Sequence, residues 1–162
     1  MKKYLQILFL ILLANFSIAE TTEFSYSNLG KLPILFNGRT QPFDSVARYN
    51  LLIIREKTKF NRNSKTISAT QWLWEVFTHN EAIYSDEIFL IDNPEVKYEL
   101  NLDENKKIFS FNEIKQNIQL ILTKANGLTD KEKKSAYESN IIHLGQKITL
   151  FNILLHTFLP FD

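Results

Sequence analysis

Apolar residues recur near the end of the chain at the spacing of a helix. From Tyr137 to Phe158 they lie alternately four and three residues apart, the heptad pattern of a helix with one continuous apolar stripe. Thr129 and Glu132 have the spacing of a capping box, so we expect this helix from about Asp130 to Leu159. The stripe predicts lengthwise packing against other helices of the same domain, with a coiled-coil dimer as the alternative. Over its last two turns the apolar face is wider, which indicates contact with a protein partner, with further core or with a bilayer interface.

A shorter helix is expected from about Ser45 to Lys57, with Asp44 as its N-cap. The spacing of its apolar residues places Val46, Tyr49 and Ile53 on one face, with Ala47, Leu51 and Ile54 beside them. This face should be buried. The residues that follow it, 60–65, are polar and basic and are predicted to form a loop.

A second helix is predicted over residues 70–79, where Ser68 and Gln71 fit a capping box. Its buried stripe is expected at Trp72, Leu73, Val76 and Phe77. Trp72 and Trp74 lie on nearly opposite sides of this helix. One of them is therefore expected in the core and the other partly exposed.

Weaker patterns fill the middle of the chain. The apolar run at residues 88–91 predicts a strand or an extended segment crossing the core. Residues 96–102 fit a short helix or a second strand, and residues 107–111 look extended. Helical spacing resumes over residues 112–124 and is expected to stop at Asn126 and Gly127. The whole pattern predicts a mainly α fold of α+β class: a single helical domain with a short β element and a long C-terminal amphipathic helix.

The first residues resemble an export signal. Lys2 and Lys3 precede an apolar run from Leu5 to Phe16, and Ser17-Ile18-Ala19 offers the small residues that a signal peptidase requires. The run is shorter than the roughly 20 residues of a membrane-spanning helix. We expect residues 1–19 to be a signal peptide, with an uncleaved anchor as the alternative. Residues 20–30 would then be a mobile leader and residues 31–162 the domain, in the periplasm or at the periplasmic face of the inner membrane.

Charge and composition exclude several classes of partner and of side-chain chemistry. Removing residues 1–19 takes two lysines from the 19 basic residues and leaves 17 against 18 acidic ones. This near-zero balance indicates neither nucleic acid nor an anionic lipid surface as a partner. The chain has no cysteine, which excludes disulfides, thiol redox chemistry and thiolate metal ligands.

Reactive groups are scarce along the chain. The three histidines, His79, His143 and His156, are expected on helix surfaces or at a helix end, not at a metal or haem site. The acidic residues between 86 and 95 are predicted to form a solvated face. We expect no catalytic residue, no metal and no cofactor held by this chain itself, and therefore a non-catalytic binding module. An exported enzyme with an unrecognised site is the rival.

The most informative segment is Leu32 to Arg48, which combines two prolines, an Asn-Gly pair and two arginines. Residues before proline are extended, and Asn-Gly favours a tight turn with positive φ. The candidate motif or docking residues are Asn37, Gly38, Arg39, Pro42, Asp44 and Arg48. Structurally, Arg48 can pair with Asp44 one helical turn away. Functionally, Arg39 and Arg48 can belong to a docking surface or hold an acidic group such as a haem propionate.

These residues resemble the motif that opens the extracytoplasmic domain of system II cytochrome c assembly proteins. The matching groups are Leu32-Pro33, Asn37-Gly38-Arg39, Pro42-Phe43-Asp44 and Ala47-Arg48. Weaker similarities follow in the expected order over about residues 30–160, at residues 68–74, 84–88, 92–95, 109–111 and 145–160. The chain lacks the transmembrane bundle, tryptophan-rich haem loop and membrane-embedded histidines of those proteins, so no haem ligand carries over.

The resemblance implies an accessory or scaffold role in cytochrome c maturation, in which haem is delivered and attached to apocytochrome c. The implied partner is a membrane-embedded haem synthase subunit, with apocytochrome c as a second partner and haem met only through a partner. Membrane association would come through that partner or through an uncleaved N-terminal segment. The chain would be either a piece of a split or truncated synthase or a free-standing homologue. The alternative is an exported protein-interaction domain unrelated to haem.

Overall fold

Residues 24–128 and 134–157 are described by the computed structural model of the chain. Within them the fold is mainly helical with three two-stranded antiparallel sheets, as the predicted α+β class requires. The elements in chain order are α2 (Tyr26–Leu29), β1 (Pro33–Phe36), β2 (Arg39–Pro42), α3 (Phe43–Arg55), β3 (Lys59–Arg62), β4 (Lys65–Ser68), α4 (Ala69–Phe77), the 3-10 turn η1 (Glu81–Ser85), β5 (Phe89–Leu90), α5 (Pro94–Glu99), β6 (Ile108–Phe109), α6 (Phe111–Ile114), the 3-10 turn η2 (Lys115–Asn117), α7 (Ile118–Leu128) and α8 (Ala136–His156).

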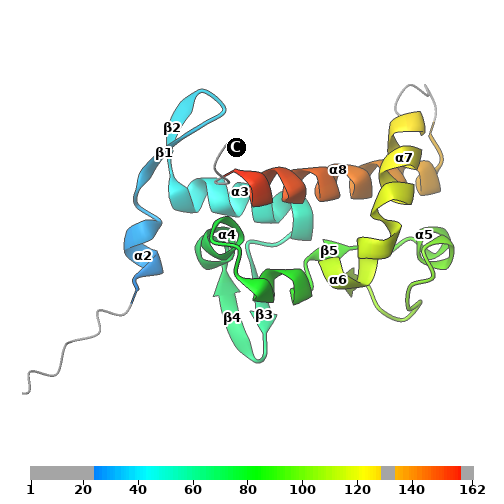
Figure 1. The fold of residues 1–162 in the computed structure, drawn as a ribbon, viewed down its shortest axis with the longest axis horizontal. Helices are drawn as coiled ribbons and strands as arrows, with labels where there is room; N and C mark the ends of the chain where they lie inside the picture. Colours follow the sequence, from blue (N-terminus) through cyan, green and yellow to red (C-terminus); the bar gives the residue numbers. More distant parts are fainter. Residues whose placement is uncertain (1–23, 129–133, 158–162) are drawn as a thin grey trace, which may run out of the picture.

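The predicted heptad stripe lies on α8 and forms much of the core. α8 packs against α3, α4, α5 and α7 and runs along one side of the molecule (Figure 1). Its buried residues include Ile141, Leu144, Ile148, Phe151 and Leu155. The prediction of lengthwise packing inside the domain is therefore confirmed. Because the stripe is covered by the chain's own helices, it is not available to a coiled-coil partner.

The ends of α8 differ from the prediction. The helix begins at Ala136 because Ser135 accepts the amide N–H of Glu138, and the Glu138 carboxylate accepts the amide N–H of Ser135. The predicted box at residues 129–132 lies outside the described residues, as does Phe158. In the last turns Leu154 is buried whereas Ile153 is exposed. No helix in the described part of the chain is long and apolar enough to cross a membrane.

α3 begins two residues earlier than predicted, and it buries one flank of the predicted apolar face rather than all of it. Its first residue is Phe43 and its N-cap is Pro42, so the prediction of Asp44 as N-cap is wrong. The buried face comprises Phe43, Val46, Ala47, Asn50, Leu51 and Ile54. Tyr49 and Ile53, predicted on that face, are exposed because α4 and α8 cover only the side that carries Ala47 and Leu51. The apolar stripe of α3 therefore extends onto its solvent side.

Residues 60–65, predicted as a loop, are part of the β3–β4 hairpin. Asn63 and Ser64 both have positive φ, 48° and 65°, which gives the turn the twist that a two-residue hairpin needs. Phe60 and Ile67 pair across the strands, and both are buried. The sequence pattern for a hairpin was weak here, because serine stands where a two-residue turn usually has glycine.

α4 follows this hairpin and agrees with the prediction at its start and in its core. The Ser68 side chain accepts the amide N–H of Gln71, which is one half of the predicted capping box. The other half is absent, since the Gln71 side chain donates to Glu75 instead. Trp72 is fully buried and Trp74 is half-buried, as expected for tryptophans on opposite sides of a helix.

The middle of the chain is divided into shorter elements than predicted. The apolar run contributes β5, which pairs with β6, and residues 94–99 form a helix rather than a strand. The expected helix over residues 112–124 is split into α6, η2 and α7. The predicted stop at Gly127 is wrong, because α7 continues to Leu128 while packed against α8.

Part of the segment expected as a mobile leader packs on the domain. Leu29 of α2 is buried, and the ring of Phe24 stacks on Trp74 with 5.3 Å between centroids. The described domain therefore begins before Lys31. The predicted signal peptide, residues 1–19, lies outside the described residues.

Candidate docking site

The predicted Asn-Gly turn joins β1 and β2 into a hairpin. Asn37 and Gly38 both have positive φ, 50° and 73°, and Phe36 pairs with Arg39 across the turn. This is the two-residue turn that the Asn-Gly pair predicts, because only residues tolerant of positive φ allow it. The prediction of an extended segment with a tight turn is confirmed.

The two faces of this hairpin have different surroundings. Residues paired across an antiparallel sheet share a face, so Pro33, Leu35, Thr40 and Pro42 form an outer face without charge. On the other face the ring of Phe36 meets that of Tyr49 of α3 edge-on, at 6.0 Å. Leu35 is 77 % exposed at the centre of the outer face. The hairpin is thus held to α3 by one face and presents the other to solvent.

Backbone hydrogen bonds fix the base of the hairpin to α2 and α3. The amide of Phe43 donates to the carbonyl of Leu32 at 2.8 Å, and the amide of Asp44 donates to the carbonyl of Gly30 at 3.0 Å. A Cβ at Gly30 would lie only 3.1 Å from the Asp44 Cβ. Glycine therefore allows α2 to approach the first turn of α3 this closely.

The Asp44 carboxylate joins α3 to α4. One oxygen accepts a hydrogen bond from the Arg48 Nε at 2.7 Å, and the other accepts one from the Thr70 hydroxyl at 2.7 Å. The predicted pairing of Asp44 with Arg48 is confirmed. Asp44 is not the N-cap because it is the second residue of α3, and the backbone carbonyls of Leu32 and Gly30 accept the first two amides of the helix. Its carboxylate points instead toward the start of α4.

A cleft of about 690 Å³ opens beside this junction, between α2, the base of the hairpin and the first turns of α3 and α4. It is lined by Tyr26, Ser27, Gly30, Lys31, Pro42, Asp44, Ser45, Arg48, Ser68 and Thr70. Its two cations are Lys31 and Arg48, and its acid is Asp44. Pro42 belongs both to the cleft and to the outer face of the hairpin, so these two surfaces are continuous.

The six candidate residues thus occupy one end of the molecule but do not all meet. Pro42, Asp44 and Arg48 line the cleft, whereas Asn37 and Gly38 form the turn at the far end of the hairpin. Arg39 follows that turn and is exposed, and its side chain makes no hydrogen bond or ion pair with any other described residue. The expected local partner of Arg39 is therefore not found in the described part of the chain.

Sequence reasoning missed a second polar centre, around Arg62 of β3. Its guanidinium group donates to both oxygens of Asp86 and, at 2.7 Å, to Glu75. Asp86 is 3 % exposed and Glu75 is 5 % exposed. The hydrogen bond to Asp86 raises the pKa of Arg62, whereas burial raises the pKa of Asp86 against the opposing effect of Arg62. In the sequence, the only sign of this site was Arg62 itself, an arginine within a polar stretch.

The acidic residues between 86 and 95 are only partly the solvated face that was predicted. Asp86 is the exception, because it is buried and forms an ion pair with Arg62. Glu87 pairs with Lys106 and Asp92 pairs with Lys107, and both carboxylates are more than half exposed. These two pairs are surface contacts of the kind that contribute little to stability.

The histidines lie on the surface. His79 follows α4 with a positive φ of 53°, and His143 and His156 are exposed on α8. Among the described residues, no group of three or more histidine, aspartate and glutamate side chains is arranged to hold a metal ion.

Comparison with known proteins finds no protein-family model and no curated sequence that matches this chain.

Proposed function

We propose that this chain is an accessory or scaffold module in cytochrome c maturation and that it docks to a membrane-embedded haem synthase. The observation that carries the proposal is where the motif residues lie in the structure. Asn37 and Gly38 shape a hairpin, while Pro42, Asp44 and Arg48 build the cleft beside it. They hold one surface of the molecule in a fixed shape, and they are the residues through which the sequence resembles system II assembly proteins.

This surface has the features of a docking site. Leu35 is 77 % exposed and Leu32 is 53 % exposed, so that binding a partner would remove apolar area from water. Arg48 is 61 % exposed, and its Nε is held by Asp44. A guanidinium group fixed in this way loses little conformational freedom when a partner carboxylate binds it. The exposed leucines would supply affinity and the cations in the cleft would supply orientation.

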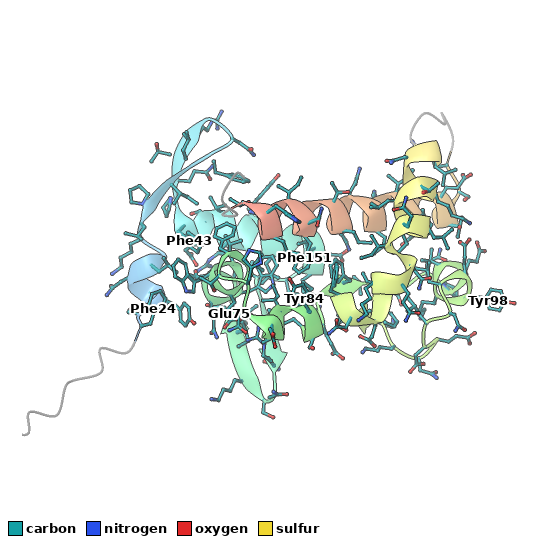
Figure 2. All side chains as sticks on the ribbon, in the orientation of Figure 1. Phe24, Phe43, Glu75, Tyr84, Tyr98 and Phe151 are labelled. Carbon is teal, nitrogen blue, oxygen red and sulfur yellow. The ribbon has the colours of Figure 1, made fainter. Side chains whose placement is uncertain are left out.

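A binding experiment with the membrane-embedded synthase tests the proposal. We would immobilise the full chain and measure its affinity for the synthase in detergent. Leu35→Asp places a charge at the centre of the outer face and should weaken binding at least tenfold, as expected for a buried interface residue. Tyr98→Asp is the matched control, because Tyr98 of α5 is 81 % exposed at the opposite end of the molecule (Figure 2).

Two results would contradict the proposal. Unchanged affinity of the Leu35→Asp variant would show that the hairpin is not the docking surface. Absence of binding by the unsubstituted chain would leave the other reading, an exported interaction domain unrelated to haem. A haem titration of the chain alone separates the roles further, since a scaffold that meets haem only through its partner should give no Soret shift.

A further inference from the structure

The cleft between α2, α3 and α4 contains more positive charge than its own acid neutralises. Its charged side chains are Lys31, Arg48 and Asp44, so one positive charge is in excess. Lys31 is exposed, and its ammonium group makes no ion pair with any other described residue. An occupant that carries one negative charge would therefore be electrostatically complementary to the cleft.

The acid of the cleft is engaged, whereas its arginine keeps most of its donors. One Asp44 oxygen accepts the Arg48 Nε–H and the other accepts the Thr70 hydroxyl. Only the Nε of Arg48 is used in this way, which leaves the four N–H groups of its two Nη atoms. Two parallel N–H groups of a guanidinium match the two oxygens of a carboxylate. Because Asp44 holds the Nε, the guanidinium group is oriented before a partner binds.

The hydroxyl groups around these cations can also donate hydrogen bonds. Ser27, Ser45 and Tyr26 line the cleft, and their hydroxyls make no hydrogen bond with another described residue. Burial raises the pKa of Tyr26, so its hydroxyl keeps its proton at neutral pH. The Ser68 oxygen accepts the amide N–H of Gln71, and its own O–H can still donate. Cations among hydroxyl donors form a site that suits an anionic oxygen group.

The position of the cleft indicates that this group belongs to a protein. The cleft has a volume of about 690 Å³, far more than one carboxylate fills, so it has room for the side chain that carries the group. Pro42 joins it to the outer face of the hairpin, where Leu35 is 77 % exposed. A partner that covers Leu35 therefore lies beside the cleft and presents its own side chains to it.

We infer that the cleft receives the carboxylate of an aspartate or glutamate side chain of the synthase, which Arg48 binds through its two Nη atoms and Lys31 through its ammonium group. The inference rests on the proposed docking function and names the group that the synthase supplies. An apolar residue of the synthase would cover Leu35 next to this acid. The carboxylate would fix the orientation in which the two proteins meet.

Charge variants of the full chain test the inference through their Kd for the synthase in detergent. Lys31→Gln removes one cation without touching Asp44 and should weaken binding about two- to fivefold. Lys31→Glu should weaken it more, because like charges repel. Arg48→Lys keeps the charge beside Asp44 but loses the paired N–H groups, and should weaken binding about tenfold.

Lys115 provides the matched control. It is exposed, makes no ion pair with another described residue and does not line the cleft. Lys115→Gln and Lys115→Glu therefore make the same changes in charge elsewhere and should leave Kd nearly unchanged. Thermal unfolding of each variant checks that the fold is kept. The Lys31 variants decide the test even if Arg48→Lys is unstable, since Lys31 holds no other described side chain.

The possible failures are distinguishable. If the unsubstituted chain binds the synthase and the Lys31 and Arg48 variants bind as tightly as the Lys115 controls, the inference is wrong and the docking function remains. Tighter binding by Lys31→Glu would show that the synthase presents a cation to the cleft, which also overturns the inference. Absence of binding by the unsubstituted chain would overturn the proposed function, and the inference with it.

Discussion

Replacing Arg62 with methionine would keep a long side chain on β3 and remove the group that holds Glu75 and Asp86. Both carboxylates are almost fully buried, and all three hydrogen bonds from the guanidinium group would be lost. Gln71 would still donate to Glu75, but Asp86 would keep no cationic partner within the described residues. The variant therefore leaves uncompensated charge in the interior.

The magnitude follows from this geometry. Removing one partner of a buried ion pair typically costs about 3–5 kcal/mol, because the remaining charge stays desolvated. For a chain of this size that corresponds to a fall of roughly 6–20 °C in Tm. The matched control is Lys107→Met. Lys107 and Asp92 are both more than half exposed, so their separation should cost less than about 1 kcal/mol.

The pH dependence identifies the cause. Without Arg62, burial would raise the pKa of Asp86 in the folded state further above its value in the unfolded chain. A carboxyl group with a raised folded-state pKa contributes stability below its unfolded pKa and loses that contribution as pH rises through the folded one. The deficit of the Arg62→Met variant should therefore be smallest near pH 4, about the usual pKa of a carboxyl group, and grow toward neutral pH.

Urea unfolding of the Arg62→Met and Lys107→Met variants across this pH range is the assay, with the free energy of unfolding as the readout. Adding Asp86→Asn to Arg62→Met should restore part of the lost stability, because it removes one of the unpaired charges. A loss in Arg62→Met no greater than in Lys107→Met, or a deficit independent of pH, would refute the interpretation of this network.

Two further predictions concern glycines whose surroundings the structure defines. Gly145→Ala would place a Cβ 2.6 Å from that of Ala125 and should destabilise the fold by about 1–3 kcal/mol, because it forces α7 and α8 apart. In Gly127→Ala the new Cβ meets nothing within 4 Å, so this variant should be more stable by about 0.4–1 kcal/mol. Thermal unfolding of both variants measures the difference, and equal effects would contradict the prediction. Gly38→Val would force a β-branched residue to a φ of 73°, so we expect a loss of about 1–2 kcal/mol and weaker binding to the synthase, and a fully stable variant with native affinity would show that the turn is not constrained.

Local rules predicted the elements whose cause is local. The Asn37-Gly38 turn follows from the positive φ that both residues tolerate, and the long helix follows from its heptad spacing. The pairing of Asp44 with Arg48 also needed only the geometry of one helical turn. The hairpin turn and this ion pair of the candidate site are therefore predictable from neighbouring residues alone.

Long-range contacts explain what the sequence did not reveal. Local spacing predicted Asp44 as an N-cap, but backbone carbonyls of Leu32 and Gly30 accept the first amides of α3, and the Asp44 carboxylate binds Thr70, 26 positions away. Arg62 and Asp86 are 24 positions apart, so neither residue marks the other. The helical period places Tyr49 on one face with Val46, but it does not determine which side of the helix the rest of the fold covers, and Tyr49 lies on the exposed side.

Hydrogen exchange of the chain with and without the membrane-embedded synthase tests the central claim most directly. We predict that the synthase slows amide exchange over residues 31–48, which include the hairpin and the first turns of α3, and leaves α5 around Tyr98 unchanged. Protection concentrated at α5, or no protection within residues 31–48 at saturating synthase, would contradict the claim that the hairpin and its cleft are the docking surface.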